Sequence, residues 1–267
     1  MTLQKWIKDR AIHGFPTFSI EDVRETGMYS SEQILQNELY RLCSNKTIAS
    51  VYRGFYVIIP VQYVLRGSVP ATYYIDQLMA YLSKPYYVCM LSAAELLGAA
   101  HQRPQQFSVM TTFPKRRVVS TRNVIIDWFY REGLPEDALI TKNTETGTIR
   151  ISNPLLTAAD LVQYQQHVGG LSRVATILEE LSEQINIKSQ FASLASFVKK
   201  VTWQRLGYIL EHVVEENELA DELYEQIRNL PGSLMYMPLS TSAEDNTSER
   251  NSRWKININV QIEKDDL

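Results

Sequence analysis

Polar side chains gather on one face of a predicted helix within "YSSEQILQNELYRLCSN", residues 29–45 of this 267-residue chain. Leu35, Leu39 and Leu42 recur at helical spacing, so that stripe should be buried. At about 100° per residue, the side chains that point away from it are Gln33, Gln36, Asn37, Tyr40 and Arg41. Glutamine and asparagine pair with adenine edges, and arginine pairs with guanine or phosphate. The pattern favours a surface that contacts duplex DNA, with an ordinary solvated helix face as the alternative.

A predicted hairpin follows this helix in "NKTIASVYRGFYVIIP", residues 45–60. Two runs rich in β-branched and aromatic residues flank Arg53-Gly54, and a tight hairpin turn often needs a glycine with positive φ. Arg53 at the tip and Lys46 at the base should reach a DNA backbone, and Ser30 should bond to backbone oxygens. Tyr56 is expected to pack back on its own domain. We predict that Arg53→Ala and Arg41→Ala each weaken DNA binding.

The elements that must position these side chains come earlier in the chain. "LQKWIKDRA" has apolar residues at helical spacing, and Ser19 with Asp22 forms the pattern of a capping box. Helix, short strand, helix, turn, helix and hairpin is the order of a winged helix-turn-helix, whose last helix enters the major groove. The sequence therefore predicts a winged helix-turn-helix DNA-binding domain over residues 1–66.

Residues 67–267 mix both element types, so the predicted fold class is α+β with a larger α/β C-terminal domain. Ser92 and Thr157 are expected to be helix N-caps, and residues 171–230 should be mostly helical. Strands are expected over 107–114, 118–131 and 147–154, with a terminal strand at 254–262. The polar stretch at about 240–253 is expected to be a mobile loop.

No catalytic constellation emerges from the sequence. His13, His101, His167 and His212 have unrelated contexts, and Gly169-Gly170 lacks the lysine of a phosphate loop. Cys43 and Cys89 form no CxxC pair or Cys/His cluster. We therefore expect a chain that is not an enzyme and that needs no metal and no cofactor.

One basic turn keeps a second hypothesis open. Lys115, Arg116 and Arg117 could hold phosphate, either of DNA or of a nucleotide bound by an enzyme in the C-terminal domain. A solvated turn or an extension of the DNA-binding surface is the favoured interpretation.

Charge and hydropathy limit the possible partners. The net charge is −3, but residues 1–70 carry eight basic against six acidic side chains, and 215–226 is strongly acidic. That acidic segment suggests a third hypothesis, an interaction module for a basic partner. No run approaches the roughly 18 apolar residues of a membrane span, so a cytoplasmic protein without membrane contact is expected.

Three segments, in order, resemble the AbiEi-type antitoxins of type IV toxin–antitoxin systems. "LYRLCSNKTIASVYRGFYVI" is similar to the end of their winged-helix domain, where R-G-x-Y commonly ends the wing. "YVCMLSAAELLGAAHQRPQQFSVMTTFPKRR" is similar to their small-residue helix, strand and basic turn. "ISNPLLTAADLV" resembles their S-P-x-x-T-x-x-D-L segment through Thr157, Asp160 and Leu161, although Asn153-Pro154 replaces the usual Ser-Pro. The resemblance spans roughly residues 19–165.

This resemblance implies a transcriptional regulator that represses its own toxin–antitoxin operon through the N-terminal domain. The implied partners are double-stranded operator DNA and a cognate nucleotidyltransferase toxin. The C-terminal domain would be needed to counteract that toxin, with or without direct contact.

Overall fold

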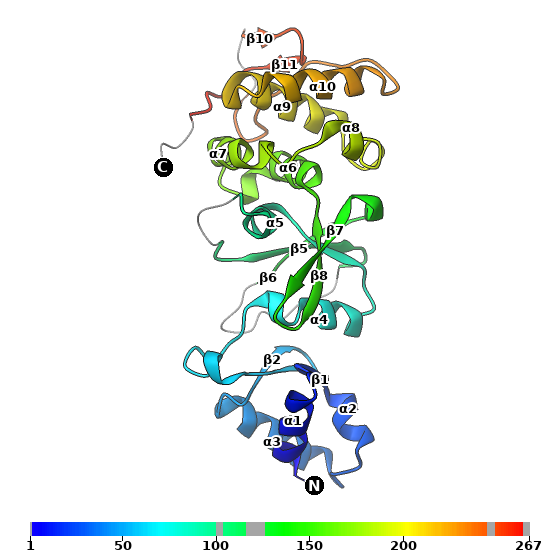
Figure 1. The fold of residues 1–267 in the computed structure, drawn as a ribbon, viewed down its shortest axis with the longest axis vertical. Coiled ribbons are helices and arrows are strands. Elements are labelled where there is room, and N and C mark those ends of the chain that lie inside the picture. The colour runs from blue at the N-terminus through cyan, green and yellow to red at the C-terminus, as the bar shows by residue number, and fades with distance from the viewer. Residues whose placement is uncertain (1, 100–103, 116–125, 245–248, 264–267) are drawn as a thin grey trace. The chain divides into compact units, whose positions relative to one another are not determined.

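The computed structural model describes residues 2–99, 104–115, 126–244 and 249–263 (Figure 1). It is a mixed α+β structure that divides into two compact units. The first unit comprises Met1–Tyr87, Gln105–Gly133 and Thr141–Arg150, and the second comprises Val88–Pro104, Leu134–Ile140 and Ile151–Leu267. The domain boundary at residue 66 stays a prediction. No helix in the described part of the chain is long and apolar enough to cross a membrane.

Three helices and three short strands form the start of the first unit. They are α1 (Leu3–Ile12), β1 (Thr17–Ser19), α2 (Ile20–Glu25), α3 (Glu32–Ser44), β2 (Ile48–Tyr52) and β3 (Phe55–Ile58). The strands form an antiparallel sheet in the order β1-β3-β2. The predicted leucine stripe of α3 is buried, and it shares one core cluster with Leu3 and Ile7 of α1 and with Phe18 of β1. The predicted order of these elements is confirmed.

The predicted capping box at α2 is also confirmed. Asp22 N donates to Ser19 Oγ at 3.0 Å, and Ser19 N donates to Asp22 Oδ2 at 2.7 Å. These bonds satisfy two backbone N–H groups at the start of a helix of only six residues. They fix the direction in which α2 leaves the sheet.

Replacing Ser19 with alanine should lower the free energy of unfolding by about 1 kcal/mol, because the N-cap acceptor is lost. Ser31→Ala is the matched control, since Ser31 is the N-cap of α3 and makes no side-chain capping bond. That variant should stay within about 0.5 kcal/mol of the wild type in urea unfolding. Equal losses for both variants would contradict the role given to the capping box.

A five-stranded sheet follows in the order β6-β5-β4-β8-β7. Its strands are β4 (Tyr86–Val88), β5 (Phe107–Thr112), β6 (Ile126–Arg131), β7 (Leu139–Thr144) and β8 (Gly147–Ser152). β5 and β8 confirm the expected strands, as does the described part of β6; residues 118–125 lie outside the described parts. The sequence pattern predicts neither β4 nor β7. β4 is three buried residues without alternation, and β7 is a mostly exposed edge strand.

Three short helices precede β4: η1 (Val61–Tyr63), η2 (Ala71–Tyr73) and α4 (Ile75–Tyr81). Within the sheet, α5 (Met90–Leu97) follows β4, and η3 (Glu136–Ala138) lies between β6 and β7. The predicted inward residues of α4, including Ile75, Leu78 and Met79, are buried.

Two predicted helix N-caps are wrong. Helix α5 starts after Cys89, which places Ser92 inside the helix, where it is buried. Helix α6 (Pro154–Gln163) is capped by Asn153, whose side chain accepts from Leu156 N at 2.8 Å. Asparagine is as good an N-cap as serine or threonine, and Pro154 at the first turn lacks the N–H that needs a cap. Thr157 instead bonds through its hydroxyl to Ser152 Oγ at 2.6 Å.

The rest of the second unit is mainly helical, as predicted for residues 171–230. It contains η4 (Gln165–His167), α7 (Leu171–Ser182), α8 (Ile187–Gln190), α9 (Lys200–Ile209), the π-helical turn η5 (Leu210–Val214) and α10 (Asn217–Arg228). The chain then forms a small sheet in the order β10-β11-β9, from β9 (Met237–Pro238), β10 (Arg250–Asn251) and β11 (Ile256–Asn257). The predicted terminal strand is therefore only two residues long.

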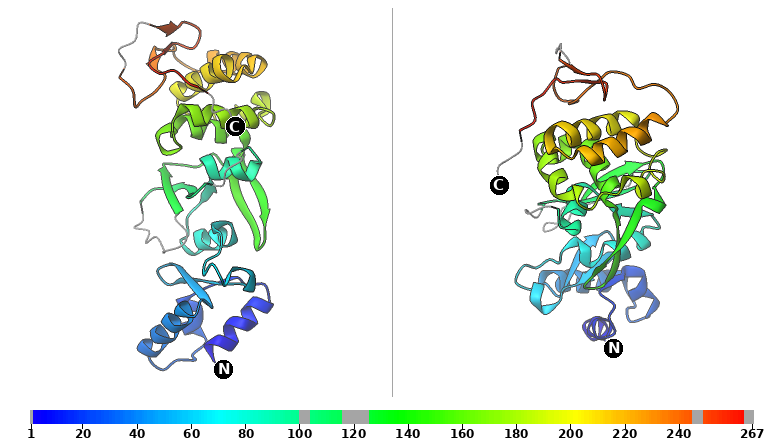
Figure 2. Two further views of the ribbon diagram at one scale, coloured as in Figure 1. Left: turned by 90° about the vertical axis from the view of Figure 1, so that its left-hand side faces the viewer. Right: turned by 45° about the horizontal axis from the view of Figure 1, so that its top comes forward.

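This small sheet is fastened to α9. In both views of Figure 2 the red strands lie next to the yellow helices. The fully buried Trp254 packs on Gly207, and Gln204 Nε2 donates to Trp254 O at 2.8 Å. The segment between β9 and β10 is bonded to the residues after β11, since Ser240 N donates to Asn259 Oδ1 at 2.9 Å. A mobile loop at about 240–253 stays a prediction, and residues 245–248 are outside the described parts.

Candidate nucleic-acid interface

The exposed face of α3 carries the amides that the sequence singled out. Gln33, Gln36, Asn37 and Tyr40 are all exposed, Tyr40 to 76%. Gln33 Nε2 donates to Asn37 Oδ1 at 3.2 Å, one helical turn along. The pair holds its two amides side by side and leaves further donors and acceptors open to a ligand. Amides exposed on one helix suit the edges of base pairs.

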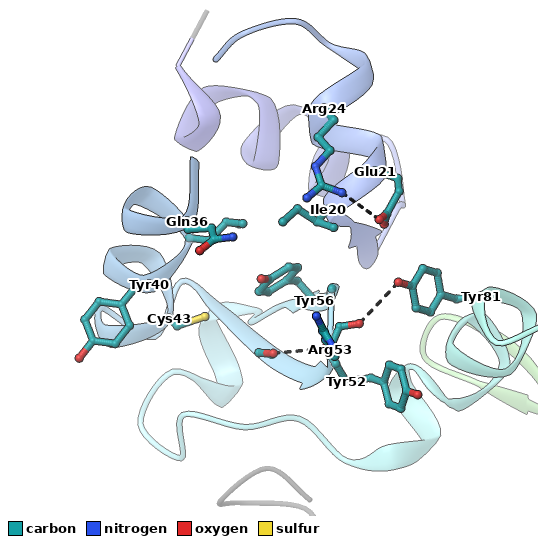
Figure 3. Close-up of a pocket in the computed structure, with 13 residues that line it drawn as sticks. Ile20, Glu21, Arg24, Gln36, Tyr40, Cys43, Tyr52, Arg53, Tyr56 and Tyr81 are labelled. Atoms are coloured by element: carbon teal, nitrogen blue, oxygen red, sulfur yellow. Dashed lines mark hydrogen bonds and ion pairs between the residues drawn. The ribbon is translucent and has the colours of Figure 1, made fainter. Parts of the chain in front are cut away.

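A groove of about 750 Å³ separates α3 from the β2–β3 hairpin (Figure 3). Its aromatic wall consists of Tyr40, Tyr52, Tyr56 and Tyr81, and its polar groups include Gln36, Arg24 and Arg53. Tyr56 lies at the centre and stacks on Phe18 with ring centroids 5.3 Å apart. This contact agrees with the expectation that Tyr56 packs on its own domain. Hydroxyl and guanidinium donors on one concave surface match the acceptors of a sugar–phosphate backbone.

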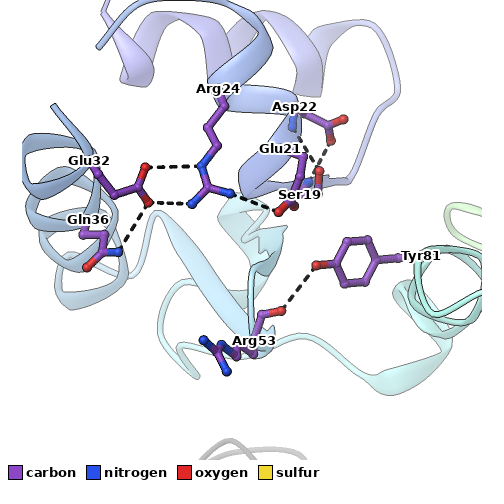
Figure 4. Close-up of polar contacts among 8 residues, drawn as sticks. All are labelled: Ser19, Glu21, Asp22, Arg24, Glu32, Gln36, Arg53 and Tyr81. Atoms are coloured by element: carbon purple, nitrogen blue, oxygen red, sulfur yellow. Dashed lines mark hydrogen bonds and ion pairs between the residues drawn. The ribbon is translucent and has the colours of Figure 1, made fainter. Parts of the chain in front are cut away.

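Arg24 of α2 is fixed at the edge of the groove by two carboxylates (Figure 4). Its guanidinium donates to both oxygens of Glu32, at 2.6 and 3.3 Å, and to Glu21 at 3.2 Å. The hydrogen bonds from Arg24 lower the pKa of Glu32, which also accepts from Gln36 Nε2 at 3.4 Å. Exposed ion pairs add little stability, so the main effect is to hold α2 and the start of α3 in one geometry.

The hairpin tip is formed by Arg53 and Gly54. Gly54 has φ of +76°, which confirms the expected turn glycine. The side chain of Arg53 is exposed and lines the groove. Within the described part of the chain no carboxylate forms an ion pair with it. Its charge therefore remains available to an anionic partner.

The other predicted contact residues have different surroundings. Arg41 is tied to Glu38 by two hydrogen bonds of 2.6 and 3.0 Å, which raise its pKa. Lys46 Nζ donates to Leu65 O at 3.5 Å, so its side chain follows the segment after the hairpin. Ser30 is exposed in the turn between α2 and α3. The structure thus brings Gln36, Tyr40 and Arg53 into one groove. Outside its lining it leaves Ser30, Gln33, Asn37, Arg41 and Lys46.

The basic turn is only partly described. Lys115 Nζ lies 5.7 Å from the ring centroid of Tyr130, in a cation–π contact. Arg116 and Arg117 lie outside the described residues, so a phosphate site in this turn stays a prediction.

Arg24, Tyr52 and Tyr81 are among the groove residues that the sequence patterns do not indicate. Periodicity assigns Arg24 to a helix that supports α3, and Tyr81 to the next domain. The alternation of β2 and β3 could have indicated Tyr52, since it stands directly before the hairpin tip. No local pattern indicates Tyr81, which is 28 residues from Arg53.

The described residues contain no group of three or more His, Cys, Asp or Glu side chains that could hold a metal. Cys43 lines the groove, where burial raises the pKa of its thiol, so it stays protonated and a poor nucleophile. His212 is held by Asn251, with His212 Nε2 and Asn251 Nδ2 2.8 Å apart. The groove lining itself offers binding groups, namely tyrosine hydroxyls, an amide and two guanidinium groups.

A comparison with protein families matches residues 86–212 to the AbiEi antitoxin C-terminal domain. The chain carries an AbiEi antitoxin domain. The resemblance predicted from the sequence motifs is therefore confirmed, including the segment with Thr157, Asp160 and Leu161. AbiEi antitoxins are not an enzyme family, in agreement with the prediction that this chain is not an enzyme.

The AbiEi antitoxin domain begins at β4 and ends in η5, so the groove and α3 lie outside the matched segment. The crystal structure of the RV2827C protein from Mycobacterium tuberculosis has a similar fold, with a TM-score of 0.68 and 12% identity. The similarity covers 94% of this chain and 88% of that one, so it includes the residues before the AbiEi antitoxin domain. No curated protein matches.

Proposed function

We propose that this protein is an antitoxin that represses its own toxin–antitoxin operon. Residues 1–66 form a winged helix-turn-helix that binds operator DNA, and residues 67–267 counteract a nucleotidyltransferase toxin. The protein acts in the cytoplasm, and it counteracts the toxin with or without direct contact.

The match of residues 86–212 carries the antitoxin part of this proposal. The DNA-binding part is supported by the element order α1, β1, α2, α3, β2, β3 and by the groove between α3 and the hairpin. In a winged helix the last helix enters the major groove and the hairpin tip contacts the backbone or the minor groove. Here the helix carries the exposed amides, and the hairpin tip carries Arg53, which pairs with no described carboxylate.

The proposed docking assigns each group a role. Gln33, Gln36 and Asn37 face base edges, where an amide can pair with both N6 and N7 of adenine. Arg53 neutralises a backbone phosphate, and the hydroxyl of Tyr40 donates to another. The net charge of the chain is −3, so the electrostatic attraction to DNA must come from this local surface and not from the charge of the whole molecule.

Two assays test the proposal. A duplex carrying the protein's own promoter should be shifted at low salt, and a scrambled duplex of equal length should bind at least about tenfold more weakly. Co-expression of this protein should restore growth to cells that express a cognate nucleotidyltransferase toxin. Failure of the shift would refute the repressor role, and failure of the growth rescue would refute the antitoxin role.

A further inference from the structure

The hairpin tip is packed against a residue from outside the predicted DNA-binding domain. Tyr81, at the end of α4, belongs to the same compact unit as Arg53 and Gly54. Its hydroxyl lies 3.5 Å from Arg53 O (Figures 3 and 4). Its ring centroid lies 5.1 Å from that of Phe55 and 6.4 Å from that of Tyr52. Tyr81 thus touches the residues on both sides of the tip.

Gly54 shows how close this approach is. A Cβ atom at position 54 would lie 3.1 Å from Tyr81 Oη and 3.3 Å from Ile20 Cγ2. The tip is therefore enclosed between α2 on one side and α4 on the other. The strands of the hairpin are held in the three-stranded sheet with β1, and these side-chain contacts fix the tip itself.

We propose that Tyr81 is a positioning residue for the DNA contact of Arg53. The DNA-binding surface then extends past the predicted boundary at residue 66 and includes the end of α4. The inference rests on the proposed function, because Arg53 needs a phosphate to contact. Ring packing carries most of the effect, since 3.5 Å is at the limit of a hydrogen bond.

A double-mutant cycle in the full-length chain tests this role. Tyr81→Ala should weaken operator binding about fivefold and lower the salt slope by about one unit, the same change in slope as for Arg53→Ala. In the Arg53→Ala background, Tyr81→Ala should change the Kd by less than about twofold, because the positioned group is gone. Tyr81→Phe keeps both ring contacts and should bind within about twofold of the wild type.

Tyr63→Ala is the matched control. Its hydroxyl bonds to Glu145 Oε1 at 2.6 Å, its ring packs on Tyr73, and it is not part of the groove lining, so operator affinity should be unchanged. Additive effects of Tyr81→Ala and Arg53→Ala, or an unchanged salt slope in Tyr81→Ala, would overturn the positioning role while leaving the proposed function intact. A wild-type protein that fails to bind the promoter would overturn both.

Discussion

Replacing Gly207 with alanine is expected to lower the free energy of unfolding by about 3 kcal/mol, because the added methyl group would collide with a buried tryptophan ring. A Cβ atom at this position would lie 2.0 Å from Trp254 Cζ3 and 2.1 Å from Trp254 Cη2. Neither atom can move away easily, because the Trp254 ring is fully buried and its Nε1 donates to Glu211 Oε2. The indole must therefore leave its site, and its burial is lost.

Whether Gly207→Ala destabilises or stabilises the protein tests the collision with Trp254. Alanine is preferred over glycine inside a helix by about 1 kcal/mol, so without the collision Gly207→Ala would stabilise α9. Urea unfolding followed by circular dichroism measures the change. Hydrogen exchange over residues 250–259 should be faster in the variant, since this segment is held on α9 through Trp254 and Gln204.

The same substitution, Gly207→Ala, can be tested in a Trp254→Ala variant, which lacks the indole ring. That variant alone should lose about 3–5 kcal/mol, as expected for truncation of a buried tryptophan. Adding Gly207→Ala to it should cost nothing further, because the ring that collides is absent. If Gly207→Ala stabilised the wild type, or destabilised both backgrounds equally, close packing of Trp254 on α9 would not explain the glycine.

Replacing Arg53 with alanine is expected to have the largest effect on DNA binding. Affinity for the operator should fall about tenfold, and the dependence of log K on log salt should become shallower by about one unit. The reason is that Arg53 is exposed on the groove and forms no ion pair with any described carboxylate. Unfolding by urea should be unchanged within about 0.5 kcal/mol, because the side chain is on the surface.

Arg41→Ala gives the comparison within the same protein. Arg41 already pairs with Glu38 through two hydrogen bonds, so part of its charge is neutralised before DNA arrives. We expect a loss of affinity below about threefold. Fluorescence anisotropy with a labelled promoter duplex at several salt concentrations measures both variants. A larger loss for Arg41→Ala than for Arg53→Ala would place the main phosphate contact on α3 and not on the hairpin.

The sequence by itself determined the elements whose signals are local. The leucine stripe of α3, the Ser19–Asp22 capping box and the turn at Gly54 each depend on residues within a few positions of one another. Helical periodicity and capping bonds act over three or four residues, and a hairpin turn needs only its own backbone geometry. For the same reason, three short motifs in the right order, the last of them around Thr157, indicated the resemblance to the AbiEi-type antitoxins.

Only the tertiary structure decided which distant residues meet. Arg24 forms an ion pair with Glu32 across the α2–α3 turn, and Tyr81 contacts the hairpin tip at Arg53, 28 residues earlier in the chain. Trp254 packs directly on Gly207. Strands β4 and β7 also lack a sequence signal, because a buried triplet and a polar edge strand are defined by their neighbours in the sheet. Such contacts depend on how whole helices and strands pack against one another, and the spacing of residues along the chain does not determine that packing.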